Sequence, residues 1–234
     1  MAKAEDDRKG ASRRATRPRD AASLILLRLE AGEPRVLIGR RPPGARFLPG
    51  RYVFPGGAVE PDDGRARPAS QLAADLAELM AVGNKTARAR GLAMAAVRET
   101  FEETGLLLVE PGDVGPVGST SWSTMRRRGV APALRRLAYV GRAITPVPSP
   151  IRFHARFFVA DARHVRGELG GDSELVDLHW CPVSALAELP TIEVQSFMLA
   201  HALATLTHRD AASLARPLFT RRAGRRYVSY TKPA

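Results

Sequence analysis

Short apolar runs separated by turn signals dominate the first part of the chain. Residues 22–29 (ASLILLRL) and 35–41 (RVLIGRR) have the length and composition of strands. Residues 30–34 (EAGEP) between them form a turn signal, so the pattern predicts an antiparallel pair. A loop rich in glycine and proline follows over residues 42–57, and it contains a short predicted strand at 51–54.

Two later stretches have helical spacing instead. Apolar residues recur three and four positions apart in 70–80 (SQLAADLAELM), which predicts a helix. A second helix is predicted from Gly91 to Phe101, and Gly105 is well placed to cap its C-terminal end. The segment 61–64 (PDDG) before these helices reads as a turn.

The second half of the chain mixes strands and helices without a regular alternation. The predicted elements are strands at 106–109, 137–144, 151–160, 175–181 and 226–230, helices at 183–189 and 192–207, and a helical or irregular stretch at 119–136. This mixture predicts an α/β fold with a mixed sheet and helices on both of its faces.

Composition narrows the setting of the protein. The chain has 234 residues, enough for one large domain or two small ones. Cys181 is the only cysteine, so a disulfide framework is excluded and a reducing cytoplasm is expected. No apolar run approaches the roughly 20 residues of a membrane helix. The N-terminal segment mixes acidic and basic residues without an apolar core, so we expect neither a secretory signal nor a membrane partner.

The net charge of +12 is concentrated at the two ends of the chain. Residues 1–20 are predicted to be a disordered basic tail, and residues 216–234, which contain no acid, a basic C-terminal extension. The domain between them, 21–215, is only mildly basic. No nucleic-acid-binding signature accompanies the charge, so no specific nucleic acid is expected as a partner.

Residues 98–105 (RETFEETG) carry the strongest chemical signal. Glu99, Glu102 and Glu103 are spaced so that their carboxylates project from one face of one helical turn. Like charges at this spacing repel by roughly 0.2–0.5 kcal/mol per pair. A hard divalent cation such as Mg²⁺ compensates such a cluster, because it binds carboxylate oxygens together with water and substrate phosphates. The pattern therefore indicates a metal site and phosphate chemistry.

Together with residues 56–60 (GGAVE) upstream, this octet resembles the Nudix box. The box consists of a glycine, a glutamate six residues later, a seven-residue spacer, and then the motif of residues 98–106. In this chain Asp63 stands at the first glutamate position, residues 64–97 replace the spacer, and Thr100 occupies a position that is usually aliphatic. We interpret residues 64–91 as an insertion with its own helix.

The split box, with residues 46–57 (RFLPGRYVFPGG) before it, is similar to the Nudix branch that contains the acyl-CoA diphosphatases. The resemblance implies an α/β/α sandwich, and cleavage of coenzyme A or acyl-CoA to 3′,5′-ADP and a 4′-phosphopantetheine product. Hydrolysis of ADP-ribose, NDP-sugars or nucleoside triphosphates remains an alternative, as does a non-catalytic nucleotide-binding domain. The implied partner is a nucleoside diphosphate-linked small molecule, and a homodimer is possible.

The resemblance also implies roles for the residues of the box. Glu99, Glu102 and Glu103 are expected to hold Mg²⁺ or Mn²⁺, and Gly56 lets the backbone approach the metal site. Arg98 is expected to brace the glutamates and to keep their pKa values low.

A general base and the phosphate-binding groups complete the expected site. Glu102 or Glu103 could act as the base, with Glu174 as the alternative base or an extra ligand. For the substrate we expect Gly57 and the forked donors of the arginines before it, which are Arg40, Arg41, Arg46 and Arg51. Asp63 is interpreted as a turn or helix-cap residue.

Overall fold

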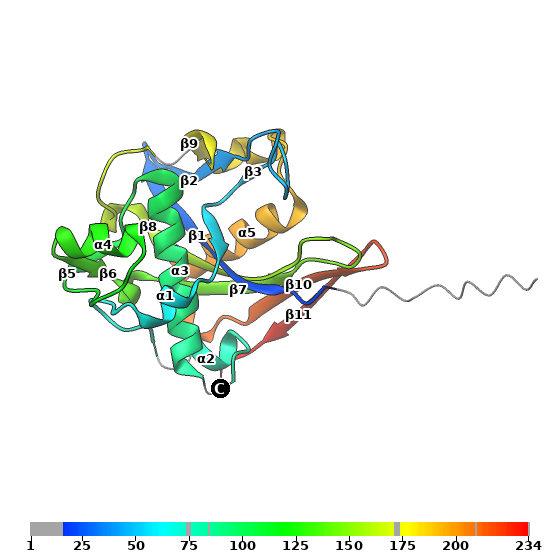
Figure 1. The fold of residues 1–234 in the computed structure, drawn as a ribbon. Coiled ribbons are helices and arrows are strands. Elements are labelled where there is room, and N and C mark those ends of the chain that lie inside the picture. The colour runs from blue at the N-terminus through cyan, green and yellow to red at the C-terminus, as the bar shows by residue number, and fades with distance from the viewer. Residues whose placement is uncertain (1–15, 74–75, 84, 171–173, 209, 234) are drawn as a thin grey trace, which may run out of the picture.

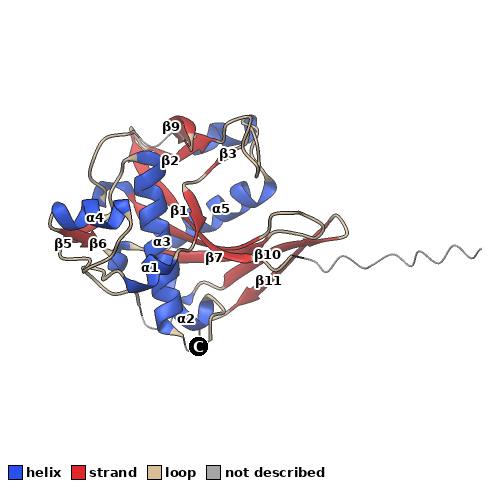
Figure 2. Ribbon diagram, in the orientation of Figure 1, coloured by secondary structure: helices blue, strands red, loops and turns tan. Residues whose placement is uncertain are grey.

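The protein folds around one large mixed sheet with helices on both sides (Figures 1 and 2). The structure is a computed structural model, and it describes residues 16–73, 76–83, 85–170, 174–208 and 210–233. The strands are β1 (Arg19–Glu30), β2 (Glu33–Arg40), β3 (Tyr52–Val53), β4 (Gly56–Ala58), β5 (Val109–Pro111), β6 (Val130–Pro132), β7 (Ala138–Ile144), β8 (Phe153–Asp161), β9 (Val176–Pro182), β10 (Arg216–Arg222) and β11 (Arg225–Thr231).

Helices of very different length accompany the sheet. The α-helices are α1 (Pro61–Arg65), α2 (Leu76–Leu79), α3 (Thr86–Thr104), α4 (Thr120–Arg127) and α5 (Glu193–Thr207). In the described residues, short 3₁₀ helices lie at Leu134–Arg136, Ala162–His164, Val183–Glu188 and Ala211–Ser213. No helix in the described part of the chain is long and apolar enough to cross a membrane.

The main sheet has the strand order β11-β10-β7-β8-β1-β2-β3, and β4 pairs with β1 while β9 pairs with β2. β1 runs parallel to β8 and β7 parallel to β10, whereas the remaining pairs are antiparallel. The predicted antiparallel pair at the start of the chain is therefore β1 and β2. β5 and β6 form a separate two-stranded sheet.

Alternation along β1 divides the interior into two cores. Leu24 and Leu26 face one side and belong to the core under α3, whereas Ile25 and Leu27 face the other side and belong to the core under α5. All four side chains are buried. Because helices cover both faces of the sheet, the predicted α/β/α sandwich is confirmed.

The helix predicted at 70–80 is mostly absent from the residues of that stretch that the structure describes. The backbone of Ala69 donates to the carbonyl of Pro132, and Ser70 forms a bridge with Ala133, so this stretch pairs with another segment instead of with itself. Among the described residues of this stretch, which exclude 74–75, helix is found at Leu76–Leu79, and its buried side chains join the core under α3. The prediction counted apolar spacing and missed this long-range pairing.

The C-terminal segment also differs from the prediction. Residues 216–234 were expected to be an extension outside the domain, but β10 and β11 form a hairpin that continues the main sheet. β10 pairs in parallel with β7, and Phe219 is buried in the core under α5. The strand predicted at 226–230 corresponds to β11, whereas β10, which begins with the buried Arg216, was not predicted.

Smaller differences concern element boundaries. The turn predicted at 61–64 is the short helix α1, and the strand predicted at 106–109 begins only at Val109. The stretch 119–136 contains α4, β6 and a 3₁₀ helix. Arg19 and Asp20, assigned to the disordered tail, begin β1, while residues 1–15 of that tail lie outside the described residues.

Candidate active site

The last two turns of α3 carry the octet 98–105, and they lie beside the loop that ends in β4. Gly105 ends the helix in the left-handed conformation, with φ 76°, and its amide donates to the carbonyl of Phe101. Thr100, the polar residue at a usually aliphatic position, is buried and donates its hydroxyl to the carbonyl of Ala96 at 2.7 Å. That bond satisfies the hydroxyl within the helix, which explains how the core accommodates it.

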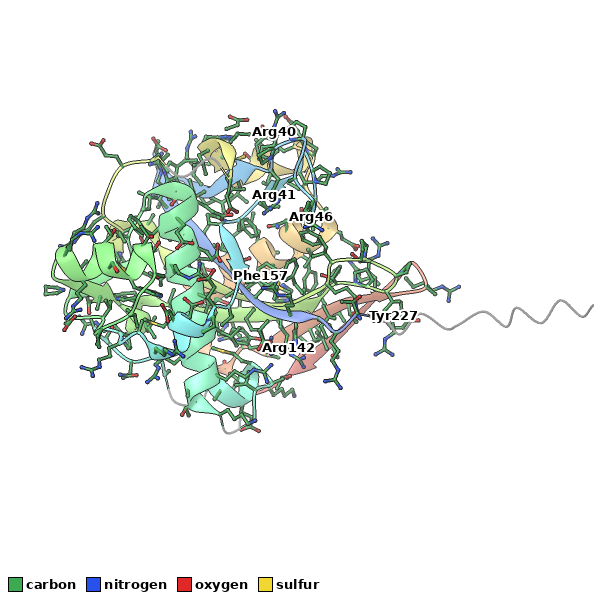
Figure 3. All side chains as sticks on the ribbon, viewed as in Figure 1. Arg40, Arg41, Arg46, Arg142, Phe157 and Tyr227 are labelled. Atoms are coloured by element: carbon green, nitrogen blue, oxygen red, sulfur yellow. The ribbon has the colours of Figure 1, made fainter. Side chains whose placement is uncertain are left out.

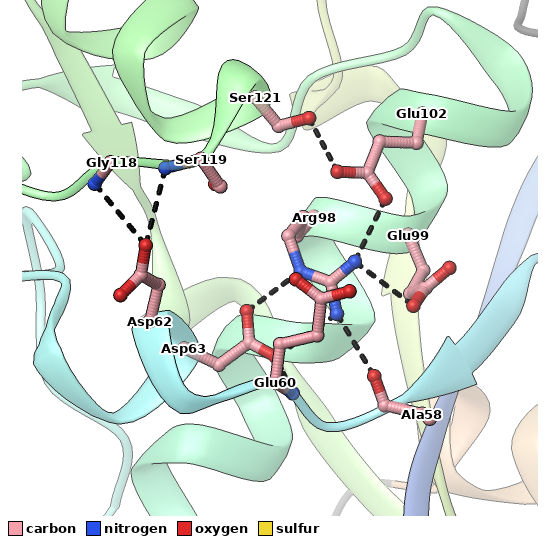
Figure 4. Close-up of polar contacts among 10 residues, drawn as sticks. All are labelled: Ala58, Glu60, Asp62, Asp63, Arg98, Glu99, Glu102, Gly118, Ser119 and Ser121. Atoms are coloured by element: carbon pink, nitrogen blue, oxygen red, sulfur yellow. Dashed lines mark hydrogen bonds and ion pairs between the residues drawn. The ribbon is translucent and has the colours of Figure 1, made fainter.

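Arg98 is fully buried and connects three elements (Figure 4). Its guanidinium donates to both carboxylate oxygens of Asp63 on α1, at 2.7 and 3.0 Å, and to the carbonyl of Ala58 on β4 at 2.9 Å. It also donates to Glu102 at 2.8 Å and pairs with Glu99 at 3.0 Å. Arg98 thus holds Glu99 and Glu102 in position, and its N–H groups donate to partners within the protein.

Asp63 is the bidentate partner of Arg98, whereas the sequence predicted for it only a turn or helix-cap role. It is fully buried and forms a bidentate ion pair with Arg98, while it also accepts the amide of Glu60 at 2.8 Å. The second contact is part of a capping box on α1, so the expected cap role is correct but incomplete. The available signal was the position of Asp63 at the first glutamate of the resembling box.

Burial would lower the pKa of Arg98, but Asp63, Glu99 and Glu102 outweigh that effect and raise the pKa above its ordinary value. The guanidinium is therefore permanently charged.

Glu103 lies deepest among the three glutamates. It is 2% exposed, and its carboxylate accepts the amide of Gly56 at 2.8 Å. Burial raises its pKa to about 8, and the neighbouring charges of Glu99 and Glu174 contribute in the same direction. The hydrogen bond from Gly56 and the charge of Arg41 oppose this shift without cancelling it.

Glu99 lies against the glycine loop. A Cβ atom on Gly57 would come within 2.4 Å of the Glu99 carboxylate, so only glycine lets the backbone approach this closely. Burial raises the pKa of Glu99 to about 7, and the charges of Glu102 and Glu174 add to the shift while Arg98 opposes it.

Glu102 and Glu174 are the more accessible carboxylates. Glu102 accepts hydrogen bonds from Arg98 and from the hydroxyl of Ser121 on α4. Glu174 is exposed just before β9, and its charge acts on both Glu99 and Glu103. The structure therefore brings all four predicted carboxylates into one electrostatic cluster.

The expectation that Arg98 keeps the pKa values of the glutamates low is wrong for Glu99 and Glu103. Arg98 does act in that direction on Glu99, but removal of water from the carboxylates has the larger effect. Two buried carboxylates with raised pKa values lack sufficient positive charge around them. This is the charge pattern that a divalent cation would complete.

The donor set fits a hard divalent cation in chemistry but is not preassembled. Among the described residues, no group of three or more acidic, histidine or cysteine side chains is arranged to hold a metal ion. Glu99 and Glu102 are instead turned toward Arg98. Because Gly57 has no side chain, the Glu99 carboxylate lies against the backbone of Gly57. Oxygen ligands for a cation could come together at this point.

Without metal, the protein is expected to lose stability between about pH 6.5 and pH 8. Folded Glu103 holds its proton more tightly than the unfolded chain does, so the folded state binds more protons and the free energy of unfolding falls as pH rises. The slope is at most about 1.4 kcal/mol per pH unit for one carboxyl. His154, whose pKa burial lowers to about 4, acts oppositely but only below its ordinary 6.5. Urea unfolding in EDTA measures the slope.

Glu103→Gln is the matched variant for this measurement, because it removes the titrating group and should flatten the slope. Equal slopes for the two proteins would show that Glu103 does not carry the raised pKa.

A cleft of about 610 Å³ opens beside the octet. Glu99, Glu102 and Glu174 line its acidic end, and Phe47, Phe153 and Phe157 line its apolar part. Apolar atoms make up most of the lining. Glu103 lies directly behind this lining, because its carboxylate accepts the amide of Gly56, which is a lining residue.

Of the arginines expected to bind phosphate, the described cleft lining includes Arg41 and excludes Arg40, Arg46 and Arg51. Figure 3 labels Arg40, the last residue of β2, and Arg41 and Arg46 in the segment between β2 and β3. Arg46 and Arg51 are exposed. Arg51 immediately precedes β3, whose first residue, Tyr52, is buried. Arg41 therefore borders the cleft, and phosphate binding by Arg40, Arg46 and Arg51 stays a prediction.

Comparison with known proteins identifies the class. No protein-family model matches the chain. The solved structure of a Nudix hydrolase from Alicyclobacillus acidocaldarius is 30% identical with a TM-score of 0.64, and the alignment covers 85% of this chain and 97% of that one. A Mutator MutT protein from Bacillus halodurans shares the fold at 16% identity and a TM-score of 0.50, over 90% and 97% of the two chains.

The chain belongs to the Nudix hydrolase family. It is therefore an enzyme of the class that hydrolyses phosphorus-containing anhydrides, and such enzymes generally use divalent metal cations.

Proposed function

We propose that this enzyme hydrolyses the diphosphate of coenzyme A or acyl-CoA, giving 3′,5′-ADP and (acyl-)4′-phosphopantetheine. The observation that carries the proposal is the lining of the cleft, which combines the carboxylates of Glu99, Glu102 and Glu174 with a mainly apolar surface. A diphosphate with its cation suits the carboxylates, and the extended organic part of coenzyme A suits the apolar surface.

Mg²⁺ or Mn²⁺ would be held by Glu99, Glu102 and Glu103, with the backbone of Gly56 beside them. When bound, such a cation neutralises the diphosphate and lowers the pKa of an attacking water. Arg98 keeps the glutamates in place through Asp63 and Ala58, so its role is positional. Gly57 leaves the space in which the substrate can approach Glu99.

The remaining polar groups of the cleft have complementary tasks. Arg41 lines the cleft near the acidic end and presents forked donors to a phosphate. Glu102 or Glu103 accepts the proton of the attacking water, and Glu174, which reaches the cleft from the segment before β9, is the alternative acceptor.

Turnover of a substrate panel tests the proposal. With Mg²⁺ or Mn²⁺ present, we expect kcat/KM for coenzyme A or an acyl-CoA to exceed that for ADP-ribose, an NDP-sugar and a nucleoside triphosphate by at least about tenfold. EDTA should abolish the activity, and returning either ion should restore it, because the buried glutamates need a cation.

Each other outcome has a definite meaning. Preference for ADP-ribose or an NDP-sugar would change the assigned substrate but not the assigned type of reaction. Absence of turnover with every diphosphate would contradict the assigned site. A homodimer stays a prediction.

A further inference from the structure

A row of four alanines, ended by Phe219, runs across the sheet beneath the cleft. In the strand register Ala58 of β4 faces Ala21 of β1, Ala21 faces Ala155 of β8, Ala155 faces Ala143 of β7, and Ala143 faces Phe219 of β10. All five residues line the cleft. Four steps between neighbouring strands, each about 4.8 Å, place Phe219 about 19 Å from Ala58.

The far wall of the cleft comes from the C-terminal hairpin. Phe219 and Arg221 are two residues apart on β10 and therefore face the same side, toward the cleft. Arg222 faces the other side, where its guanidinium lies over the ring of Tyr227 at 5.9 Å. Phe219 is held from behind by Phe197 of α5, with ring centroids 5.2 Å apart.

Arg221 has two internal contacts, and neither is a close ion pair. Its guanidinium donates to the carbonyl of Gly224 at 2.9 Å and lies 3.5 Å from the carboxylate of Glu193, which also borders the cleft. Glu193 is shared with Arg226, which it meets at a shorter distance, 3.1 Å. Arg221 therefore keeps donors for an acceptor that enters the cleft.

We propose that Phe219 and Arg221 determine specificity by binding the end of the substrate arm that lies farthest from the diphosphate. This inference rests on the proposed function for the position of the diphosphate at the glutamates. The arm it requires is extended, largely apolar and equipped with carbonyl oxygens. Phe219 packs against its apolar part, and Arg221 donates to a carbonyl oxygen.

The dimensions favour a pantetheine-like arm over a nucleoside. A nucleoside is compact and would cover only the first part of a floor about 19 Å long. A pantetheine chain is longer, and it alternates methylene groups with amides, which matches a cleft with an apolar floor and one forked donor at its end. The alanines leave the depth that such a chain needs, because larger side chains at Ala143 or Ala155 would fill the cleft.

Titration calorimetry with two non-reacting probes tests the inference. The probes are 4′-phosphopantetheine, which contains the arm, and 5′-AMP, which contains the nucleoside. Arg221→Ala should weaken binding of 4′-phosphopantetheine by about tenfold and change the Kd for 5′-AMP by less than about twofold. Arg222→Ala, the neighbour that faces away, is the matched control and should leave both Kd values unchanged.

Phe219→Leu and Ala143→Leu provide independent variants, because the first shortens the wall and the second fills the floor. Both should weaken 4′-phosphopantetheine selectively, and circular dichroism reports whether each variant is folded. The inference is overturned if 5′-AMP is weakened as much as 4′-phosphopantetheine, if Arg222→Ala matches Arg221→Ala, or if the wild-type protein does not bind 4′-phosphopantetheine.

Turnover by the wild-type enzyme, measured separately, distinguishes the two proposals. Selective loss of 4′-phosphopantetheine binding in Arg221→Ala, together with no hydrolysis of any diphosphate by the wild-type enzyme, would support the role of the hairpin and refute the proposed reaction. Hydrolysis of coenzyme A without that selective loss would refute the role of the hairpin alone.

Discussion

Glu103→Gln is expected to lower kcat by about 100- to 1,000-fold, the scale seen when one preorganised electrostatic group is lost from an active site. The side chain keeps its size, and its amide oxygen can still accept from the amide of Gly56. What disappears is the negative charge that completes the carboxylate cluster. Steady-state kinetics with saturating Mg²⁺ and substrate measures the change.

Stability should move in the other direction. Glutamine at position 103 removes a buried carboxyl whose pKa is raised to about 8, so at pH 8 the metal-free variant should unfold at the same temperature as the wild-type protein or higher. Glu110→Gln is a suitable control, because Glu110 pairs with Arg135 and lies outside the cleft lining. Near-normal kcat in Glu103→Gln would remove Glu103 from the site.

Asp63→Ala is expected to be the most destabilising single change near the site. Asp63 and Arg98 form an ion pair that excludes water on both sides, with side chains 0% and 2% exposed. Removing one member of a buried ion pair typically costs about 3–5 kcal/mol. Arg98 would keep Glu99 and Glu102 as its remaining charged partners. Arg98 would also lose its bidentate anchor, so activity should fall together with stability. Urea unfolding and kcat measured on the same preparation test both effects.

Asp62→Ala is the matched control on the same helix. Asp62 is partly exposed, and it accepts the amides of Gly118 and Ser119. We expect a loss of about 1 kcal/mol and little change in kcat. If Asp63→Ala unfolds as easily as Asp62→Ala, the buried ion pair does not have the assigned importance.

Local patterns account for the features that were predicted correctly. β1 and β2 are adjacent in the chain and joined by a turn, so their pairing could be inferred from neighbouring residues. The position of Gly105 as a helix cap likewise depends on local backbone chemistry. The brace role of Arg98 was implied by the family resemblance.

Long-range contacts account for what was missed. Ser70 pairs with Ala133, and β10 pairs with β7, so neither arrangement leaves a signature in the surrounding residues. The raised pKa of Glu103 has the same origin, because burial depends on packing by distant segments. Sequence spacing showed that three carboxylates share a face, and it could not show how much water they lose.

The parallel pairing of the central strands also bears on how the enzyme is made. β1 emerges early from the ribosome, but its neighbour β8 follows only at residues 153–161, and β7 gains β10 only at residues 216–222. Such distant pairings slow folding, because a long loop must close before any contact rewards it. The helix that carries the glutamates is therefore synthesised well before the sheet that supports it can be completed. The cleft, to which β10 contributes Phe219 and Arg221, is therefore complete only after residues 216–222 have been synthesised.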